Sequence, residues 1–243
     1  MKEFMGMPIP KCYQILDKVF EAGIDRVILY GPPGTGKTYA GLTSNLNGRP
    51  AFRLVCTEDM TSADVSGAFM PDSSGGFQWM DGLATRAWRS GGRLIIDEVD
   101  KASGDVFALL LTFTDSVASA SYDLPTGETI KPAPGFTVVM TSNMESPDEL
   151  MPALKDRFPV ALKVDAAHPA ALVPLAEELR LVAATVVAAP KGRRASLRAF
   201  YAFQQLRSTL DMEEAAHLVF GEALAKSVIE AVKVGTLTTT ATL

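Results

Sequence analysis

The segment from Gly31 to Thr38 constrains this chain more than any other. It reads Gly-Pro-Pro-Gly-Thr-Gly-Lys-Thr and follows the apolar run 27–30. Between a buried strand and a helix predicted at 39–46, this pattern is typical of a loop that surrounds phosphates, because glycines let backbone N–H groups turn inward. The helix start adds partial positive charge. Glycine and proline that only punctuate a loop would leave the complete pattern unexplained. We therefore predict a nucleoside triphosphate site, formed by Gly31, Pro32, Pro33, Gly34, Thr35, Gly36, Lys37, Thr38 and Tyr39.

Composition narrows the class of protein. The chain has 243 residues, 47% of them hydrophobic, which allows one large domain or a large and a small one. A net charge of −5 gives no general attraction to nucleic acid or anionic membranes, although a local basic channel in an oligomer stays open. The amino terminus lacks a signal-peptide pattern, and charged residues interrupt the apolar stretch 170–189. We expect a cytoplasmic protein with no membrane insertion and no nucleic-acid partner.

Two cysteines, Cys12 and Cys56, are too few for a disulfide framework and lack the spacing of a metal site. We expect both to be buried apolar side chains in a reducing compartment.

Apolar runs alternate with helical stretches through the first two thirds of the chain, and only helical patterns follow. The alternation predicts an α/β fold with a parallel five-stranded sheet and helices on both faces, followed by a small all-helical lid. The predicted strands are 26–30, 51–56, 93–99, 136–141 and 160–164, and the later helices are 170–189, 196–209, 212–220 and 222–234. The predicted domains are a nucleotide-binding core at 1–167, the lid at 168–234 and a mobile tail at 235–243.

Polar residues at the ends of two predicted strands extend the site. Asp97 and Glu98 end the run 93–99; the first acid would hold the Mg2+ shell, and the second would polarise the attacking water. Asn143 follows the run 136–141 and could bind both the γ-phosphate and that water. Acids at strand ends and turn-forming asparagines are common, so these roles depend on the upstream loop.

Several motifs in order resemble the AAA+ ATPases of the MoxR-type branch, which is related to gas-vesicle, metal-enzyme activase and McrB-like ATPase modules. Beyond the phosphate loop, the acids and the asparagine, the segments that carry the resemblance are 76–92, 97–102, 124–130, 152–158 and 196–199. Met144 stands where a proline is common, and Lys155 where an apolar residue is common.

The resemblance implies a ring, of six subunits by analogy, that hydrolyses ATP to ADP and phosphate with Mg2+ and remodels or activates a protein client. Arg157 would enter the neighbouring subunit's site and act in catalysis with Glu98, Asn143 and Lys37. In a monomer, Arg157 would instead pair with Asp156 or Glu149 at the surface. A von Willebrand-type partner would have to be a separate protein.

The resemblance also implies a sensor role for an arginine of the lid. Arg198 would contact the nucleotide in cis, with Arg193 and Arg194 as alternatives.

Two further segments differ from a simple α/β pattern: an insert at about 61–82 and a hairpin at about 120–132. Glycines and a proline interrupt the insert, and aromatic residues are interleaved with them. These aromatics would pack as a small hairpin core, or, on the family reading, the insert and the hairpin would project toward the pore of the ring to engage a partner.

Other readings stay open. A P-loop small-molecule kinase explains Lys37 and the lid arginines but not Glu98, Asn143 or the segment 156–158. A nucleotide-switched scaffold without productive turnover does not need Glu98 or Arg157. A DNA-directed motor of the McrB type finds no support in the net charge.

Overall fold

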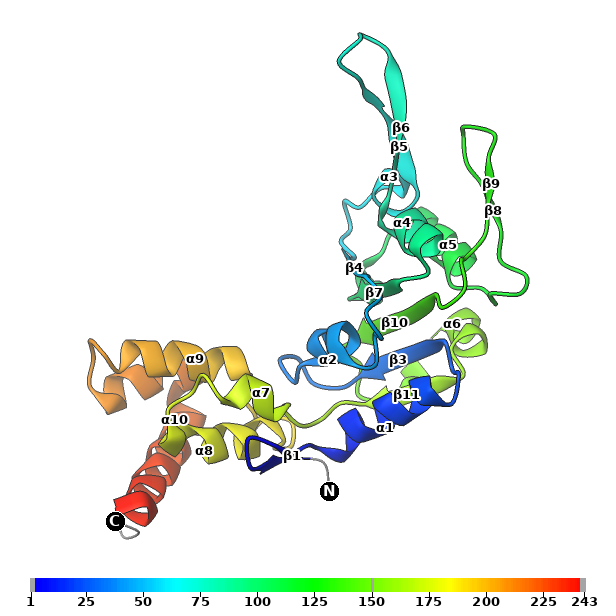
Figure 1. The fold of residues 1–243 in the computed structure, drawn as a ribbon. Coiled ribbons are helices and arrows are strands. Elements are labelled where there is room, and N and C mark those ends of the chain that lie inside the picture. Colours follow the sequence, from blue (N-terminus) through cyan, green and yellow to red (C-terminus); the bar gives the residue numbers. More distant parts are fainter. Residues whose placement is uncertain (1–2, 150, 241–243) are drawn as a thin grey trace. The chain divides into compact units, whose positions relative to one another are not determined.

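A computed structural model describes residues 3–149 and 151–240 of the chain, with side chains described up to residue 234 (Figure 1). By their contacts the residues form two compact units. The sheet unit comprises residues 15–31 and 37–163. The helical unit comprises the described parts of 1–14, 32–36 and 164–243.

The sheet unit is built on five parallel strands in the order β11-β3-β10-β7-β4. They are β3 (Arg26–Tyr30), β4 (Ala51–Val55), β7 (Arg93–Asp97), β10 (Thr137–Ser142) and β11 (Val160–Lys163). The predicted fold class is therefore confirmed. Strand β7 ends two residues before the predicted Val99, because Glu98 adopts a left-handed backbone conformation that turns the chain out of the sheet.

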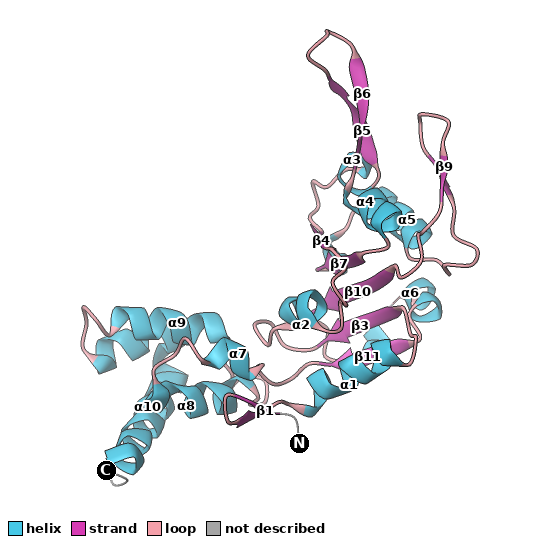
Figure 2. Ribbon diagram, in the orientation of Figure 1, coloured by secondary structure: helices cyan, strands magenta, loops and turns pink. Residues whose placement is uncertain are grey.

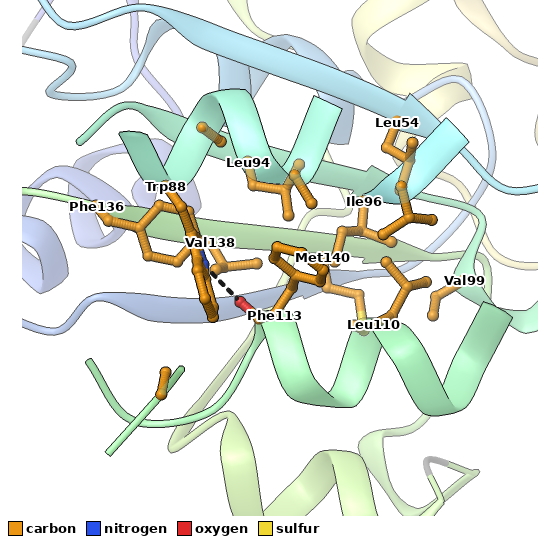
Figure 3. Packing of buried hydrophobic residues seen from close by; sticks show 14 of the residues in the cluster. Leu54, Trp88, Leu94, Ile96, Val99, Leu110, Phe113, Phe136, Val138 and Met140 are labelled. Carbon is orange, nitrogen blue, oxygen red and sulfur yellow. Dashed lines mark hydrogen bonds between the residues drawn. The ribbon is translucent and has the colours of Figure 1, made fainter. Parts of the chain in front are cut away.

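Helices cover both faces of this sheet. On one face, Leu94 and Ile96 of β7 share a buried cluster with Trp88 and Leu110 (Figure 3). On the other face, Gly41 lies so close to the sheet that an added Cβ atom would be 3.1 Å from a methyl group of Val139. Successive residues of a strand point to opposite faces, so continuous apolar runs such as 94–96 bury both.

Several helices lie around the sheet, and one of them corresponds to the helix predicted at 39–46. They are α1 (Lys11–Glu21), α2 (Lys37–Thr43), α3 (Ser62–Val65), α4 (Leu83–Ser90), α5 (Gly104–Phe113) and α6 (Pro152–Arg157), with short 3-10 turns at Val99–Lys101 and Pro147–Glu149. Helix α2 begins at Lys37 itself, two residues earlier than predicted. After α1 the chain passes through Gly23 at φ 83°, a conformation that favours glycine.

Two antiparallel hairpins extend from the sheet unit, and both are visible in Figure 2. One joins β5 (Gly67–Pro71) to β6 (Phe77–Asp81), and the other joins β8 (Tyr122–Asp123) to β9 (Thr129–Ile130). They fall in the predicted insert at 61–82 and the predicted hairpin at 120–132.

The aromatic residues of the first hairpin do not form the small core considered above. Phe69 meets Trp79 edge to face, but Phe69 is 48% exposed and Phe77 70% exposed. An isolated two-stranded ribbon has no second layer that could cover them. Arg89 of α4 connects both hairpins, since its guanidinium donates to Asp81 at 2.7 Å and to both oxygens of Glu128 at 2.7 Å.

The helical unit contains α7 (Pro169–Leu172), α8 (Glu177–Val187), α9 (Leu197–Leu206) and α10 (Met212–Thr240), with a short hairpin of β1 (Glu3–Phe4) and β2 (Met7–Pro8). The prediction of a single helix at 170–189 is wrong. Pro174, which has no N–H group, lies between α7 and α8. Helix α10 is interrupted at Gly221 (φ 69°, ψ 170°), between the two helices predicted at 212–220 and 222–234. Fully buried Phe200 and Phe203 lie in the core of this unit.

The structure covers some of the remaining predictions only in part. The tail predicted as mobile at 235–243 is helical as far as Thr240, and residues 241–243 lie outside the described residues. The proposed domain boundary at residue 167 stays a prediction. Cys12 and Cys56 are both buried and reduced. In the described part of the chain, no helix has the length and apolar character needed to cross a membrane.

Candidate functional site

The predicted phosphate loop connects β3 to α2. Its glycines are in left-handed or related conformations, with φ values of 129° at Gly31, 77° at Gly34 and 93° at Gly36. Such values are accessible mainly to glycine, so the loop backbone requires these residues. An added Cβ at Gly34 would also lie 2.4 Å from the Cβ of Ser196, the residue that caps α9.

Thr35 stabilises the interior of this loop. Its side chain is fully buried, and its hydroxyl donates to the carbonyl of Pro32 at 2.9 Å. The carbonyl of Thr35 accepts from the Tyr13 hydroxyl at 2.8 Å. These two bonds hold the loop in shape from within and from the start of α1.

Lys37 begins α2 and is 7% exposed. Its ammonium group donates to the carbonyl of Gly31 at 2.8 Å and to the side-chain oxygen of Asn143 at 2.9 Å. Burial lowers the pKa of Lys37 to about 8, against the opposing effect of nearby Asp97 and Glu98. Lys37 and Asn143, predicted from separate strand ends, are therefore brought together.

Asp97, at the end of β7, is 2% exposed and accepts three side-chain donors. The Thr38 hydroxyl lies 2.9 and 3.0 Å from its two oxygens, the Thr141 hydroxyl 2.6 Å from Oδ1, and the Arg53 Nε 2.6 Å from Oδ2. Thr38 of the phosphate loop and Asp97, which were predicted as site residues separately, are thus in direct contact. A hydroxyl and a carboxylate are the hard oxygen donors that Mg2+ takes from a protein when phosphates and waters complete its shell, so these residues fit the ion.

Glu98 has φ 56° and ψ 44°, values that are uncommon for a residue with a side chain and that cluster at functional sites. Its carboxylate is 39% exposed and pairs with Lys101 at 2.6 Å. This pair raises the pKa of Lys101. The Glu98 side chain is therefore accessible to solvent, and so is that of its partner Lys101.

Strand order explains why these groups meet. Strand β10 lies between β3 and β7, and all three run parallel. Their carboxyl ends therefore share one edge of the sheet, where open α/β sheets bind ligands. The phosphate loop, Asp97 and Asn143 each follow one of these three ends.

The remaining predicted residues are placed as follows. Arg157, at the end of α6, donates to the carbonyls of Leu111 and Ala153, both at 3.2 Å. The alternative of an ion pair with Asp156 or Glu149 is not found among the residues that the structure describes. Tyr39 is 38% exposed on α2.

The lid arginines lie near the start of α9. Arg198 is exposed in its first turn, and Arg193 is exposed before it. Their roles, and that of Arg157 in a neighbouring subunit, stay predictions.

Two residues of this site were not predicted from the sequence: Arg53 and Thr141. Arg53 is the one charged residue of the segment Ala51–Val55, and Thr141 is one of three hydroxyl-bearing residues of Thr137–Ser142. The charge marks Arg53 as unusual, but the partner of each residue depends on the strand order.

Comparison with known proteins decides the family. A profile of the AAA domain (dynein-related subfamily) matches residues 26–158, more than half of the chain and nearly all of the site. The chain belongs to this AAA+ family. Relatives place the AAA+ protein in the MoxR-type branch, as the motifs indicated.

Two curated relatives extend the match. Protein NorQ of Paracoccus denitrificans is 38% identical over 160 residues, which cover 63% of this chain and 58% of NorQ. Denitrification regulatory protein NirQ of Stutzerimonas stutzeri is 33% identical over 181 residues, 72% of this chain and 62% of NirQ. The AAA+ protein thus spans about three fifths of these relatives.

Among solved structures, NtrX from Brucella abortus in complex with ADP has a TM-score of 0.56 at 16% identity, covering 90% of this chain and 53% of that one. At this identity the likeness supports the fold alone.

Proposed function

We propose that this AAA+ protein hydrolyses ATP to ADP and phosphate with Mg2+, and that a ring of its subunits uses hydrolysis to remodel or activate a protein client. The observation that carries the proposal is the contact of Thr38 with Asp97 beside the contact of Lys37 with Asn143, at one edge of the sheet. Four groups with the chemistry of phosphoryl transfer converge there from three adjacent strands.

Each group has a task that its geometry allows. Bound Mg2+ would neutralise charge on the β- and γ-phosphate oxygens. Thr38 and Asp97 would hold it, and Lys37 would exchange its bonds to Gly31 and Asn143 for phosphate oxygens. The Asn143 amide would then be available to orient water, and Glu98 would take its proton after turning away from Lys101.

Ring assembly and the trans role of Arg157 belong to the same proposal. The guanidinium donates to two backbone carbonyls, which are neutral and leave its positive charge in place. Its charge could therefore stabilise the charge that grows on a neighbour's γ-phosphate in the transition state, an effect worth about 10³- to 10⁵-fold in rate. Arg198 would contact the nucleotide within its own chain.

A protein client is proposed because the first hairpin exposes large apolar side chains, with Phe77 70% and Met80 55% exposed. Such side chains favour contact with other proteins. A von Willebrand-type protein is proposed as a separate partner, from the resemblance to the MoxR-type branch. No nucleic-acid partner is proposed.

Phosphate release by the purified protein with Mg2+ and ATP tests the hydrolysis. We expect turnover that rises with protein concentration as rings form, loss of ATP binding in Lys37→Ala, and no change in Lys18→Ala, a matched lysine on α1. ATP use that requires a small-molecule phosphate acceptor would indicate a kinase. ATP binding without phosphate release would indicate a scaffold.

Mixing variants tests the trans role of Arg157. Arg157→Ala should bind ATP but not hydrolyse it. Mixed with Glu98→Gln, which keeps Arg157, it should regain part of the turnover, because some interfaces then contain both intact groups. A mixture that never regains turnover would contradict the intersubunit site, while hydrolysis by the wild-type protein would still stand.

A further inference from the structure

Arg53 contacts the acid that the proposed function assigns to magnesium. Its Nε atom lies 2.6 Å from Oδ2 of Asp97. The two side chains differ in exposure: that of Arg53 is 48% exposed, and that of Asp97 only 3%. The ion pair therefore joins a fixed, buried anion to a cation that reaches in from solvent.

The position of Arg53 explains this difference. Strand β4 is the edge strand of the sheet and pairs only with β7 in it. Arg53 lies opposite Ile95, two residues before Asp97, and its long side chain extends along the strand toward the carboxyl edge. At an edge strand such a side chain can turn into water with little loss of packing.

Asp97 is fixed by other bonds. Its Oδ1 accepts from the hydroxyls of Thr141 and Thr38, and the Thr38 hydroxyl also reaches Oδ2. Among the hydrogen bonds given above, only that of Arg53 comes from a charged donor. The ammonium group of nearby Lys37 also acts on Asp97 electrostatically, so Arg53 and Lys37 together offset the buried carboxylate, with Arg53 in direct contact. An uncompensated buried carboxylate would be strongly unfavourable.

We propose that Arg53 is the counter-cation of Asp97 in the nucleotide-free protein, and that Mg2+ arriving with nucleotide displaces it. The inference rests on the proposed function, because that function places Mg2+ at Asp97. A divalent ion and a guanidinium at one carboxylate repel each other, which disfavours their joint binding, and the half-exposed arginine is the group free to move away. Arg53 thereby keeps the site formed before nucleotide binds and weakens magnesium binding when nucleotide is present.

The test measures ADP binding with and without Mg2+ by calorimetry, and unfolding temperature in the same buffers, so that neither readout depends on turnover. In Arg53→Gln we expect Mg2+ to bind the ADP complex at least about threefold more tightly than in the wild type, since a repulsive charge is gone. ADP affinity in EDTA should change less than about twofold. Arg53→Lys, which keeps the charge, should retain near-wild-type Mg2+ affinity.

The unfolding temperature is the second measurement of this test. Without nucleotide, Arg53→Gln should unfold at a lower temperature than the wild type, and saturating Mg2+ and ADP should raise it by more than in the wild type. The matched control is Arg26→Gln, which removes an arginine that pairs with Asp25 at 3.0 Å at the amino end of β3. It should leave the response to Mg2+ unchanged.

Two results would overturn the inference. One is a Mg2+ affinity in Arg53→Gln that is equal to or weaker than that of the wild type. The other is a large loss of ADP affinity in EDTA, which would place Arg53 on the phosphates. If Mg2+ did not affect ADP binding by the wild-type protein, the proposed function would be contradicted as well. The two results above contradict only the role of Arg53, so failure of the inference and failure of the proposed function are distinguishable.

Discussion

The two ends of strand β7 each involve an arginine, and the comparison separates a structural charge from an exchangeable one. At the carboxyl end, half-exposed Arg53 pairs with buried Asp97. At the amino end, Arg93 is itself 2% exposed, its described hydrogen-bond acceptors are neutral, and the nearby Asp17 acts on it electrostatically. Burial lowers the pKa of Arg93 to about 10, so the group is still charged at neutral pH.

Neutral groups hold Arg93 in place. Its Nε donates to the Thr137 hydroxyl at 3.0 Å, and its Nη1 donates to the carbonyls of Gly41, at 3.0 Å, and Ser44. The guanidinium also lies over the ring of Phe20, 3.9 Å from its centre. These carbonyls end α2, whose first residues face the proposed phosphate site.

The same residue type thus has different roles at the two ends of strand β7. A cation at the carbonyl end of a helix satisfies unpaired acceptors and complements the helix dipole, so Arg93 acts on stability. Arg53 balances a charge that another cation is proposed to take over, so it acts on binding. Variants at the two ends should therefore separate chemistry from folding.

The largest expected effect is at the carboxyl end. Glu98→Gln should lower the rate of phosphate release by about 10²- to 10⁴-fold, because the base is lost, while ATP affinity and unfolding temperature stay near those of the wild type. Steady-state phosphate release and calorimetric ATP binding measure this. Glu21→Gln, an exposed change at the end of α1, is the control. Near wild-type turnover in Glu98→Gln would show that another group activates the water.

At the amino end the expected change is in stability. Arg93→Met fills similar volume but leaves the carbonyls of Gly41 and Ser44 without their donor. We expect the free energy of unfolding in urea to fall by about 2 kcal/mol, with ADP affinity per folded molecule unchanged. A variant as stable as the wild type would mean that the desolvation of a buried cation cancels its hydrogen bonds. Arg93 would then make no net contribution to the stability of the fold.

The smallest expected effects are at the two ends of strand β10. Thr141 donates to Asp97 at one end, and Thr137 accepts from Arg93 at the other. Thr141→Val and Thr137→Val should each lower the free energy of unfolding by about 1 kcal/mol. Only Thr141→Val should also change the response of ADP binding to Mg2+, measured by calorimetry. Equal responses in both variants would contradict the division between the two ends.

The sequence was sufficient for the sheet, because apolar residues recur in all five strands, as expected of parallel strands that helices cover on both faces. It was also sufficient for the phosphate loop, since Gly31, Gly34 and Gly36 occupy conformations that favour glycine. Asp97 and Asn143 lie at the carboxyl ends of parallel strands. Once a parallel sheet was predicted, the two residues were therefore expected at the same edge of it.

The arginines could not be predicted in the same way. Arg53 is the one charged residue of β4, and Arg93 shares β7 with Asp97 at its other end. Nothing local indicates whether such an arginine side chain reaches a carboxylate, helix carbonyls or water. Their partners come from strands and helices distant in sequence, and are set by the order and register of β4, β7 and β10. The exposure of Phe77 was missed because aromatic residues usually indicate a core.

Gly41 has a consequence for the dimensions of the proposed magnesium site. It lies one turn after Thr38 on the same face of α2, and a methyl group there would press on Val139 at 3.1 Å. The neighbours would have to yield by a few tenths of an ångström, within one turn of the Thr38 hydroxyl that contacts Asp97 at 2.9 Å. Because residue 41 has no side chain, α2 can lie close to the sheet beside the proposed Mg2+ site. The spacing between this helix and the sheet thus helps to set the geometry available to a small ion.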